Sequence, residues 1–415
     1  MVKEGYKEVT VRAKGYLIPN DWEAKNVIEC FDFKNGKAFY KVGYTNKGKK
    51  VIDLMNISRR GKFQELDGKQ KFISEENYKK YSDYKLNKND LIIAMSDMSK
   101  KLWILGRTAI IPKDDEYILN QRIGKLSYNG NMNIKFGNYA TNSNYFIRQL
   151  KVVAKGTAQK YVNTGEIKNA IIFSPPLPEQ KKIASILSSV DKAIEKTDEV
   201  IEETKELKKG LMQELLTKGI GHSEFKEVKI GVKKYDIPNK WEVKKLEECC
   251  EISYGKDQSD VEDENGNYPI LGTGGLIGYA DDYLYDKASV LIGRKGTIDN
   301  PQYMETPFWT IDTLFYTNDF NETYPKWLYY YLNYYDLSLL NEATGVPSLN
   351  RNNLYNLGLP YPPLSEQKKI ASILSAVDSK IKKEEEYKAK LERLKKGLMQ
   401  KLLTGEIRVN TEMEV

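Results

Sequence analysis

From Pro175 to Thr217 the chain reads PPLPEQKKIASILSSVDKAIEKTDEVIEETKELKKGLMQELLT, and from Pro362 to Thr404 it reads PPLSEQKKIASILSAVDSKIKKEEEYKAKLERLKKGLMQKLLT. The two segments align without a gap, 187 residues apart, and agree at 28 of 43 positions. An internal repeat shows how a chain is assembled from units, so this duplication decides the fold prediction. We therefore expect the chain to consist of two units of similar structure.

Each copy is predicted to be one long helix. The paired prolines end the preceding segment and set the helix start, where proline is tolerated. In the first copy apolar or small residues recur at alternating spacings of three and four, and Leu187, Ile194 and Ile201 widen this stripe. The predicted heptad seam is Ile183, Ile186, Val190, Ala193, Thr197, Val200, Thr204, Leu207 and Leu211. Matched seams favour an internal antiparallel pair; unrelated surface helices, or coiled coils with partner chains, are the alternative.

A second repeat precedes each helix. YLIPNDWEAKNVIECFDFKNG begins at Tyr16 and YDIPNKWEVKKLEECCEISYG at Tyr235. Both predict an extended segment that leads into a short helix, with Trp22 and Trp241 as buried anchors. The predicted domains are a globular domain (1–174), a long helix (175–218), a second globular domain (219–361), and a second long helix with a C-terminal tail (362–415).

The globular domains are predicted to be α+β. Buried strands are expected at 90–95, 108–111, 288–292 and 308–316, without the rhythm of a βαβ fold. An aromatic-rich helix over 324–340 is expected to pack in the core rather than to stack on bases. The predicted fold is therefore two α+β domains separated by two long antiparallel coiled-coil helices, with a pseudo-two-fold internal repeat.

Charge is unevenly distributed along the 415 residues, whose formal net charge is +7. Residues 1–174 carry 32 basic and 18 acidic side chains, whereas residues 219–361 have a net charge of about −9. A basic domain suits a polyanion such as nucleic acid, and the acidic second domain departs from that expectation. Cys30, Cys249 and Cys250 lack metal-site spacing, so a cytoplasmic protein without zinc is expected. No apolar run approaches the length of a membrane span.

No catalytic constellation is recognisable. The segment 272–278 (GTGGLIG) resembles a dinucleotide-binding loop, but Ile277 stands where the third glycine belongs, so a tight turn is favoured. The segments 300–303 and 174–177 each match only part of the signature of amino-group DNA methyltransferases. His222, the one histidine, lies between the domains and is expected to be solvated. We expect no cofactor, no metal site and no enzymatic activity in this chain alone.

The PPLxEQKKIA entry, the long helix and the GLMQxLLT exit resemble the conserved regions of type I restriction–modification specificity subunits. The Ile-Pro-x-x-Trp-Glu openings and the segment 290–296 (VLIGRKG) resemble the target recognition domains of those subunits. The resemblance covers nearly the whole chain. It implies a non-catalytic subunit that reads a bipartite target in double-stranded DNA, one domain per half-site. It also implies two methyltransferase (M) subunits docked on the helices, with restriction/translocase (R) subunits as optional partners.

Residues that face DNA are expected in polar loops, because Arg and Lys suit guanine edges, Asn and Gln suit adenine, and Ser and Thr suit either. The segment 344–351 is aligned with 156–163, just before the helix entry of the first unit. The candidates are Ser96, Lys100, Lys101, Gln121, Arg122, Thr157, Gln159 and Lys160 in the first domain, and Thr273, Arg294, Lys295, Ser348, Asn350 and Arg351 in the second.

Two other classes of function remain open on the sequence alone. One is a stand-alone regulator that binds a bipartite DNA site without enzyme partners, although the acidic second domain opposes it. The other is a DNA methyltransferase with an unrecognised site, which binding of S-adenosylmethionine by this chain alone would reveal.

Overall fold

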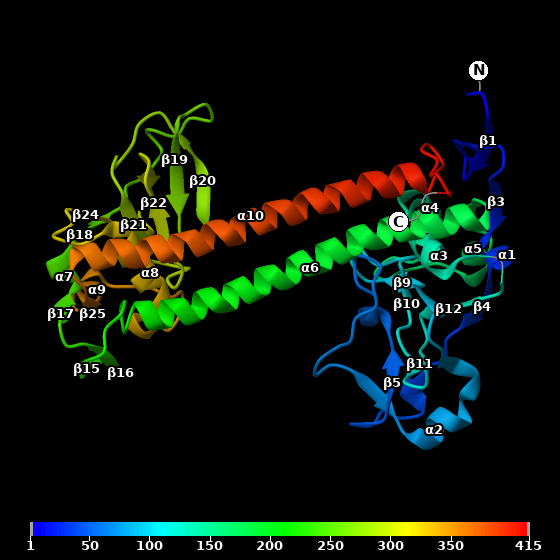
Figure 1. Ribbon diagram of the computed structural model, residues 1–415, viewed down its shortest axis with the longest axis horizontal. Coiled ribbons are helices and arrows are strands. Elements are labelled where there is room, and N and C mark those ends of the chain that lie inside the picture. The colour runs from blue at the N-terminus through cyan, green and yellow to red at the C-terminus, as the bar shows by residue number, and fades with distance from the viewer. Residues whose placement is uncertain (1–2, 131, 232, 413–415) are drawn as a thin grey trace. The chain divides into compact units, whose positions relative to one another are not determined.

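The computed structural model describes residues 3–130, 132–231 and 233–412. The chain forms two compact units (Figure 1). Unit 1 consists of Met1–Lys196 together with Lys388–Val415, and unit 2 consists of Thr197–Tyr387. Each unit contains one globular domain and parts of both long helices, α6 (Leu177–Leu215) and α10 (Leu364–Leu402). Unit 1 is therefore discontinuous in sequence, whereas unit 2 is one continuous segment.

The domain of unit 1 is built on an antiparallel four-stranded sheet ordered β10-β8-β12-β4. A second four-stranded sheet, ordered β6-β5-β11-β7, contains one parallel pair, β5 with β11. Three two-stranded pairs complete the strands, β1-β2, β13-β9 and β14-β3. The strands are β1 (Tyr6–Val11), β2 (Lys14–Pro19), β3 (Glu23–Asn26), β4 (Phe31–Asn35), β5 (Lys49–Ile52), β6 (Lys71–Ile73), β7 (Lys85–Leu86), β8 (Leu91–Ala94), β9 (Ser96–Asp97), β10 (Thr108–Ile110), β11 (Tyr117–Leu119), β12 (Ile123–Tyr128), β13 (Lys160–Tyr161) and β14 (Ile171–Ser174). The short helices are α1 (Val27–Cys30), α2 (Glu75–Lys80), α3 (Ile134–Thr141), α4 (Asn144–Val152) and α5 (Thr164–Lys168).

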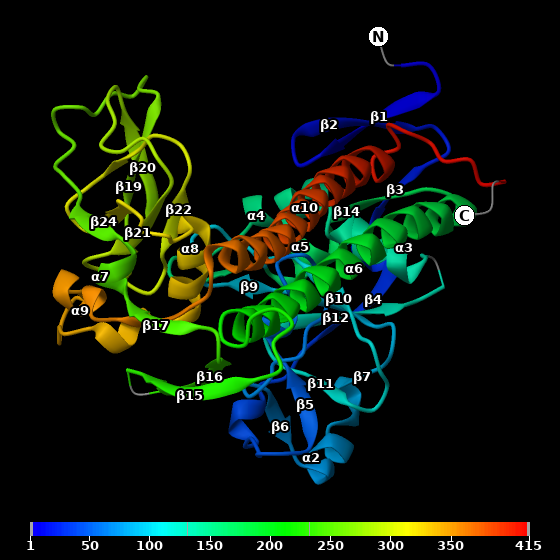
Figure 2. The ribbon, with the colours of Figure 1, turned by 60° about the vertical axis from the view of Figure 1, so that its left-hand side comes forward.

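The domain of unit 2 repeats the first of these sheets, with strands ordered β22-β21-β24-β18. A three-stranded sheet, β20-β19-β23, and the pairs β15-β16 and β17-β25 complete it. Helix α8 lies against β21 and β22 (Figure 2). The strands are β15 (Phe225–Ile230), β16 (Lys233–Pro238), β17 (Glu242–Lys245), β18 (Glu251–Tyr254), β19 (Tyr268–Gly272), β20 (Gly275–Ala280), β21 (Ser289–Gly293), β22 (Gln302–Met304), β23 (Trp309–Thr310), β24 (Leu314–Asn318) and β25 (Gly358–Tyr361). The short helices are α7 (Leu246–Cys249), α8 (Pro325–Tyr334) and α9 (Arg351–Tyr355).

Most predicted elements are present, and two are interrupted. The segment predicted as one strand over 308–316 is two strands, β23 and β24, separated by a turn at 311–313. The aromatic helix ends at Tyr334, and a 3-10 turn follows at Leu337–Leu340. Trp327, Tyr330 and Tyr331 are buried, which confirms that this helix packs in the core.

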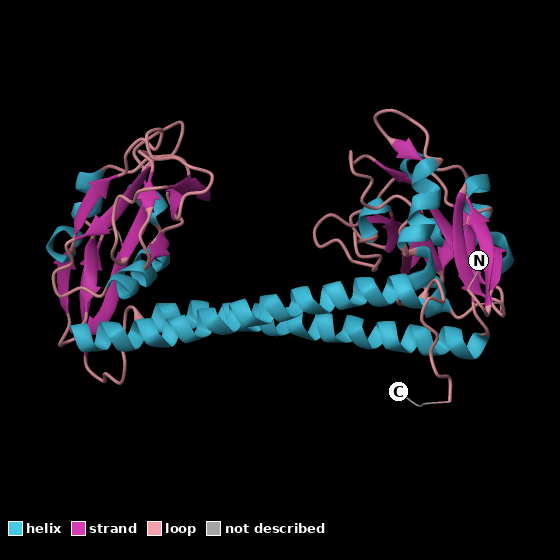
Figure 3. Ribbon diagram, turned by 90° about the horizontal axis from the view of Figure 1, so that it is seen from above, coloured by secondary structure: helices cyan, strands magenta, loops and turns pink. Residues whose placement is uncertain are grey.

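Helices α6 and α10 pack on each other in opposite directions. In unit 1 the first half of α6 lies against the last part of α10, and in unit 2 the last half of α6 lies against the first part of α10. Figure 3 shows these two helices as the longest elements of the chain. Their ends enter the two cores: Ile183 and Leu187 pack with Leu402 and Leu403 in unit 1, and Leu215 and Leu216 belong to the core of unit 2.

The register of the helix seam differs from the prediction. Leu187, Ile194 and Ile201, predicted as a flank, are buried together with Thr197 and Thr204. Ile186 and Val200 are only partly buried, Ile186 against the core of unit 1, and Leu207 is exposed. Periodicity located the apolar stripe but could not decide which of two adjacent rows faces the partner helix, since both rows repeat every seven residues.

The Pro-Pro-Leu-x-Glu-Gln entry has a structural role in each unit. Gln180 donates from Nε2 to the Pro175 carbonyl at 2.9 Å, and its Oε1 accepts the backbone N–H of Asn133 at 2.8 Å. In unit 2, Gln367 makes both bonds again, to the Pro362 carbonyl at 2.9 Å and to the N–H of Tyr324 at 2.8 Å. These bonds fix the start of each long helix to its domain.

The glutamate of the same motif forms a second contact, which we term the clasp. In unit 1, Trp22 Nε1 donates to Glu179 at 3.0 Å, and Arg408 from the C-terminal tail donates to both Glu179 and Asp21. Gly405 begins this tail at a positive φ of 72°, and a side chain there would collide with Pro19. The tail is therefore held against the first domain.

The clasp of unit 2 uses the segment after α6. Trp241 Nε1 donates to Glu366 at 3.1 Å, and His222 Nε2 lies 2.9 Å from the same carboxylate. His222 thus occupies the position that Arg408 has in unit 1, three residues after a glycine of positive φ, here Gly219. The prediction that His222 is solvated is wrong, because its side chain is largely enclosed by this clasp.

A third duplicated contact, the clamp, joins each domain to both long helices. In unit 1, Asp191 of α6 accepts Tyr139 Oη at 2.7 Å and Lys395 Nζ of α10 at 2.7 Å. In unit 2, Asp378 of α10 accepts Tyr330 Oη at 2.7 Å and pairs with Lys208 Nζ of α6 at 2.6 Å. Each clamp therefore fixes the register of the helices and the seat of one domain helix, α3 or α8.

Candidate nucleic-acid interface

The candidate interface of unit 1 lies where β8 ends. Strand β9 (Ser96–Asp97) continues from β8 and pairs with β13 (Lys160–Tyr161), just before α5. Gln159 donates from Nε2 to Ser96 Oγ at 3.1 Å. Ser96, Gln159 and Arg122 line one pocket of about 430 Å³. The structure thus brings together three of the eight candidates of the first domain.

The other five candidates do not line this pocket; Lys160 lies in β13 and the other four lie on loops. Lys160 pairs across the sheet with Asp97, and Gln121 precedes Arg122 in the β11–β12 turn. Thr157 lies in the turn before β13. Lys100 and Lys101 lie on the 98–104 loop, where the Lys101 ammonium is 5.5 Å from the ring centre of Trp103.

Asp97 shapes the 98–104 loop. Its carboxylate accepts the backbone N–H groups of Ser99 and Ile104 at 2.7 Å each and that of Leu105 at 3.3 Å. Burial raises the pKa of Asp97, but these hydrogen bonds outweigh burial and hold the pKa below its ordinary value. Asp97 is therefore an anchor of the loop rather than a DNA-facing group.

The candidate interface of unit 2 is centred on Tyr254, at the end of β18. The guanidinium groups of Arg294 and Arg351 lie 5.3 Å and 5.0 Å from the centre of its ring. The side chain of Tyr254 remains exposed, and Arg351 Nε has no hydrogen-bond partner among the described residues. An aromatic ring flanked by two cations can stack on a base, and the cations can then contact the edge of that base or the phosphate of its nucleotide.

The remaining candidates of unit 2 surround this group. Lys295 and Ser348 form a β-bridge, and the N–H of Gly296 donates to the Pro347 carbonyl at 2.9 Å. A side chain at Gly296 would contact Thr273, so the β19–β20 turn lies next to the Lys295 loop. Asn350 caps α9 by accepting the N–H of Asn352 at 2.8 Å, so its side chain is committed to the helix start.

The two interfaces are topologically equivalent. The N–H of Val162 donates to the Met95 carbonyl at 2.8 Å, and the N–H of Leu349 donates to the Arg294 carbonyl at 2.9 Å, 187 residues later. These bonds pair Asn163 with Asn350 and Thr164 with Arg351. The predicted alignment of 344–351 with 156–163 is therefore one residue out of register.

This equivalence identifies residues that the sequence prediction omitted. Asn163 and Thr164 line the pocket of unit 1, together with Asn35, whose Oδ1 accepts Thr164 Oγ1 at 2.9 Å. Asn35 has the place in β4 that Tyr254 has in β18. The repeat from Tyr16 and Tyr235 places both residues just before a glycine, so the sequence contained a signal for them.

The three cysteines have no part in either interface. All three are buried and free of disulfides. Burial raises the pKa of Cys30 to about 12 and that of Cys249 to about 11, so neither thiol is a nucleophile near neutral pH. Within the described ranges, His, Cys, Asp and Glu side chains do not gather as a metal ion would require. Within those ranges, too, no helix combines the length and apolarity needed to cross a membrane.

Two α+β domains with matching loop clusters, together with one antiparallel helix pair, define a protein with a duplicated two-domain architecture. The sequence model of the type I restriction modification DNA specificity domain matches residues 19–205 and 238–393. The chain belongs to this family and is a type I specificity subunit.

Individual proteins are similar to this chain in sequence or in fold. The chain is 28% identical over 468 residues to the type I restriction enzyme MjaVIII specificity subunit of Methanocaldococcus jannaschii, a match that covers 99% of this chain and 98% of that protein. The fold is similar to that of the type I restriction–modification S subunit of M. genitalium, with a TM-score of 0.59, 18% identity, and coverage of 92% and 96%. A chain from a structure of type I restriction–modification complex assembly gives a TM-score of 0.54 at 19% identity, with coverage of 94% and 100%.

Proposed function

We propose that this specificity subunit reads a bipartite target in double-stranded DNA, one half-site by each domain. The observation that carries this proposal is the recurrence of one loop cluster at the same sheet edge in both units. In unit 1 the cluster contains Ser96, Arg122 and Gln159, and in unit 2 it contains Arg294 and Arg351 around Tyr254. Because the side chains differ at equivalent places, the two half-sites should differ in sequence.

The long helices are proposed to dock two methyltransferase (M) subunits. Leu187, Ile194 and Ile201, which widen the predicted apolar stripe, are buried within this chain and are not available to a partner. Leu207 and Leu394, however, occupy equivalent positions in the two copies and are 56% and 51% exposed. Two equivalent apolar positions, one in each unit, suit two copies of the same partner.

In this proposal the chain itself is not an enzyme and needs no cofactor, because methyl transfer belongs to the M subunits. A restriction/translocase (R) subunit is an optional further partner. The complex would act on DNA in the cytoplasm. A stand-alone regulator would instead bind its site without M subunits, and a methyltransferase would bind S-adenosylmethionine by itself.

Domain exchange tests the two-reader proposal. Residues 223–361 are replaced by the second domain of another member of the family, and the methylated sites of a host that expresses the chimera with its M subunit are sequenced. We expect one half-site to change and the other to persist. If both half-sites change together, the domains do not read independently.

Native mass spectrometry of the co-expressed complex tests the docking proposal. We expect one specificity chain with two M subunits, and Leu207→Asp or Leu394→Asp should each remove one of them. A complex that saturates with a single M subunit would contradict the proposed equivalence of the two positions.

A further inference from the structure

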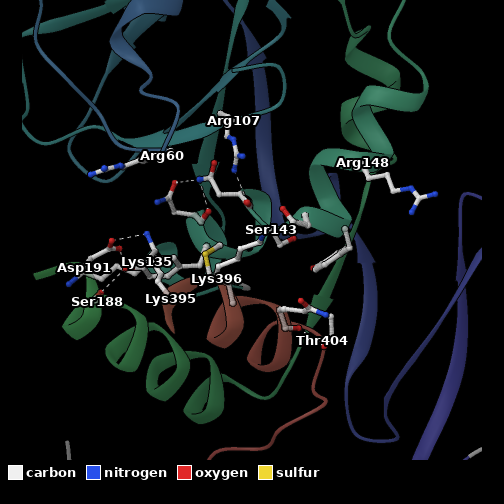
Figure 4. A pocket seen from close by; sticks show the side chains of 18 of the residues that line it. Arg60, Arg107, Lys135, Ser143, Arg148, Ser188, Asp191, Lys395, Lys396 and Thr404 are labelled. Atoms are coloured by element: carbon white, nitrogen blue, oxygen red, sulfur yellow. Dashed lines mark hydrogen bonds and ion pairs between the residues drawn. The ribbon is translucent and has the colours of Figure 1, made fainter. Parts of the chain in front are cut away.

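A large cleft in unit 1 lies outside the loop cluster described above. Its volume is about 1240 Å³, and its walls come from the 59–63 loop, helices α3 and α4, the β1–β2 hairpin and the unit 1 parts of α6 and α10. Figure 4 shows basic side chains from several of these elements around it, among them Arg60, Arg107, Lys135 and Arg148.

The cleft is strongly basic. Eleven lysine and arginine side chains line it, against four carboxylates. The carboxylates are already engaged in ion pairs, Asp191 with Lys395, Glu195 with Lys62, Glu392 with Arg60, and Glu406 with Lys401. The excess of positive charge is therefore not balanced from within the cleft.

Four exposed cations carry much of this excess. Lys135 lies on α3, Arg148 on α4, Lys192 on α6 and Lys396 on α10, and the described residues offer none of them a carboxylate partner. Like charges gathered in one concavity repel each other unless an anion binds among them. A ligand that carries several negative charges is the chemistry that fits.

Arg107 connects the cleft to the loop cluster. It directly precedes β10, and its carbonyl accepts the N–H of Ala94 at 2.9 Å; the Arg122 carbonyl accepts the N–H of Met95 at 2.9 Å on the other side of β8. Because β8 runs antiparallel to both β10 and β12, three residues lie at the same end of these strands: Arg107 just before β10, Arg122 just before β12, and Ser96 just after β8. The cleft therefore adjoins the proposed base-reading site.

We propose that this cleft binds the phosphate backbone of DNA beside the half-site read by the first domain. The inference rests on the proposed function and assigns the two domains unequal tasks. The first domain supplies sequence-independent affinity, while the acidic second domain supplies mainly base recognition. An acidic protein segment would satisfy the same charges, but the position of Arg107 at the same strand ends as the loop cluster favours DNA.

The test measures the salt dependence of DNA binding by the full-length chain. The probe is a labelled duplex of about 30 base pairs of arbitrary sequence, titrated by fluorescence anisotropy at several salt concentrations. One variant carries Lys135→Gln and Arg148→Gln, and a second carries Lys192→Gln and Lys396→Gln. The matched control removes the same charge from exposed residues of unit 1 outside the cleft, with Lys69→Gln and Lys79→Gln.

Each phosphate contact that is lost lowers the slope of log K against log salt by about 0.9. We expect each cleft variant to lower the slope by up to about 1.8, the control to leave it unchanged, and Arg148→Lys to retain the contact. All substituted residues are exposed, so matched circular dichroism and melting curves are expected.

Three results would overturn the inference. If both cleft variants bind with the wild-type slope, the cleft does not contact phosphates, although the proposed function would stand. If the control lowers the slope equally, the cleft has no special role. Polyglutamate serves as a second probe in the same titration. If the cleft variants lose binding to polyglutamate but not to DNA, the cleft is a site for an acidic protein. Failure of the wild-type chain to bind the duplex at low salt would instead reject DNA recognition by this chain alone.

Discussion

The clamp occurs once in each unit, and the clamp of unit 1 is more deeply buried than that of unit 2. The side chains of Asp191 and Lys395 are 13% and 16% exposed, whereas those of Asp378 and Lys208 are 35% and 25% exposed. The hydrogen-bond lengths are nearly the same in the two clamps. Asp191 has one further cation nearby, Lys62 Nζ at 3.4 Å. A difference in cost between the two aspartates would therefore report burial together with this additional ion pair.

Replacement of Asp191 by alanine removes two charge-assisted hydrogen bonds and leaves Lys395 nearly enclosed without a partner. Hydrogen bonds to charged groups contribute about 1.5–3 kcal/mol, and breaking a buried pair costs about 3–5 kcal/mol. We expect a loss of about 3 kcal/mol from the free energy of opening of α3. Asp378 is more exposed, and an exposed ion pair contributes only about 0–1 kcal/mol. We therefore expect Asp378→Ala to lower the free energy of opening of α8 by about 1.4 kcal/mol.

Hydrogen–deuterium exchange of peptides from α3 and α8 measures these losses separately, because the chain has two compact units and need not unfold in one step. A factor of ten in exchange corresponds to about 1.4 kcal/mol. We expect exchange of α3 to accelerate more than about a hundredfold in Asp191→Ala, and exchange of α8 about tenfold in Asp378→Ala. An effect at Asp378 as large as that at Asp191 would refute the reasoning from burial.

The pH dependence provides an internal control. Burial raises the pKa of Asp191, but hydrogen bonds from Lys395 and Tyr139 outweigh burial and leave the pKa lowered. The stabilisation is therefore complete above the ordinary pKa of about 3.9 and is lost as the pH falls through the lowered folded-state value. The difference between the wild type and Asp191→Asn should be constant from about pH 5 to 8 and should shrink below about pH 4.

Three further predictions concern other duplicated or buried groups. Cys30 and Cys249 should resist a thiol reagent at pH 8 in the folded chain and react fully in denaturant, because burial raises the pKa of both; rapid native labelling would contradict this. Arg408→Ala should free the C-terminal tail, costing about 1–3 kcal/mol, and limited proteolysis should then cut after the end of α10. Asp97→Asn should leave the melting temperature within a few degrees but weaken DNA binding by the 98–104 loop; intact affinity would show that this loop does not face DNA.

The repeat made the helices and the pairing of the domains predictable, because 28 identities at one offset constrain both copies at once. It did not determine the seam, since Ile186 and Leu187 are equally apolar neighbours and only the partner helix selects between them. Trp22 and Trp241 were predicted as buried anchors and are fully buried. Each indole N–H donates to a glutamate that is 157 or 125 residues away in the chain. No local sequence pattern indicates these two hydrogen bonds.

Side-chain chemistry predicts the loop candidates, and the structure brings only part of them together. Arg294 and Arg351 both lie against the ring of Tyr254. The alternating pattern of the strand does not distinguish Tyr254 from other aromatic residues of the sheet. Asn350 is predicted to read a base with its amide, yet it caps a helix, a role that depends on where α9 begins. The sequence does not mark Arg107, because one arginine before a strand carries no motif. Its position is set by strand order, which the local sequence does not encode.

The discontinuity of unit 1 has a consequence for synthesis on the ribosome. Unit 2 is continuous and can complete itself once Tyr387 has emerged, whereas the first half of α6 must wait for Lys388 onward to cover Leu187 and Ile194. The interval spans about 200 residues, or roughly 10–40 s at 5–20 residues per second. During that time the nascent first domain displays an apolar stripe without its partner, so a ribosome stalled before residue 388 would present an aggregation-prone chain.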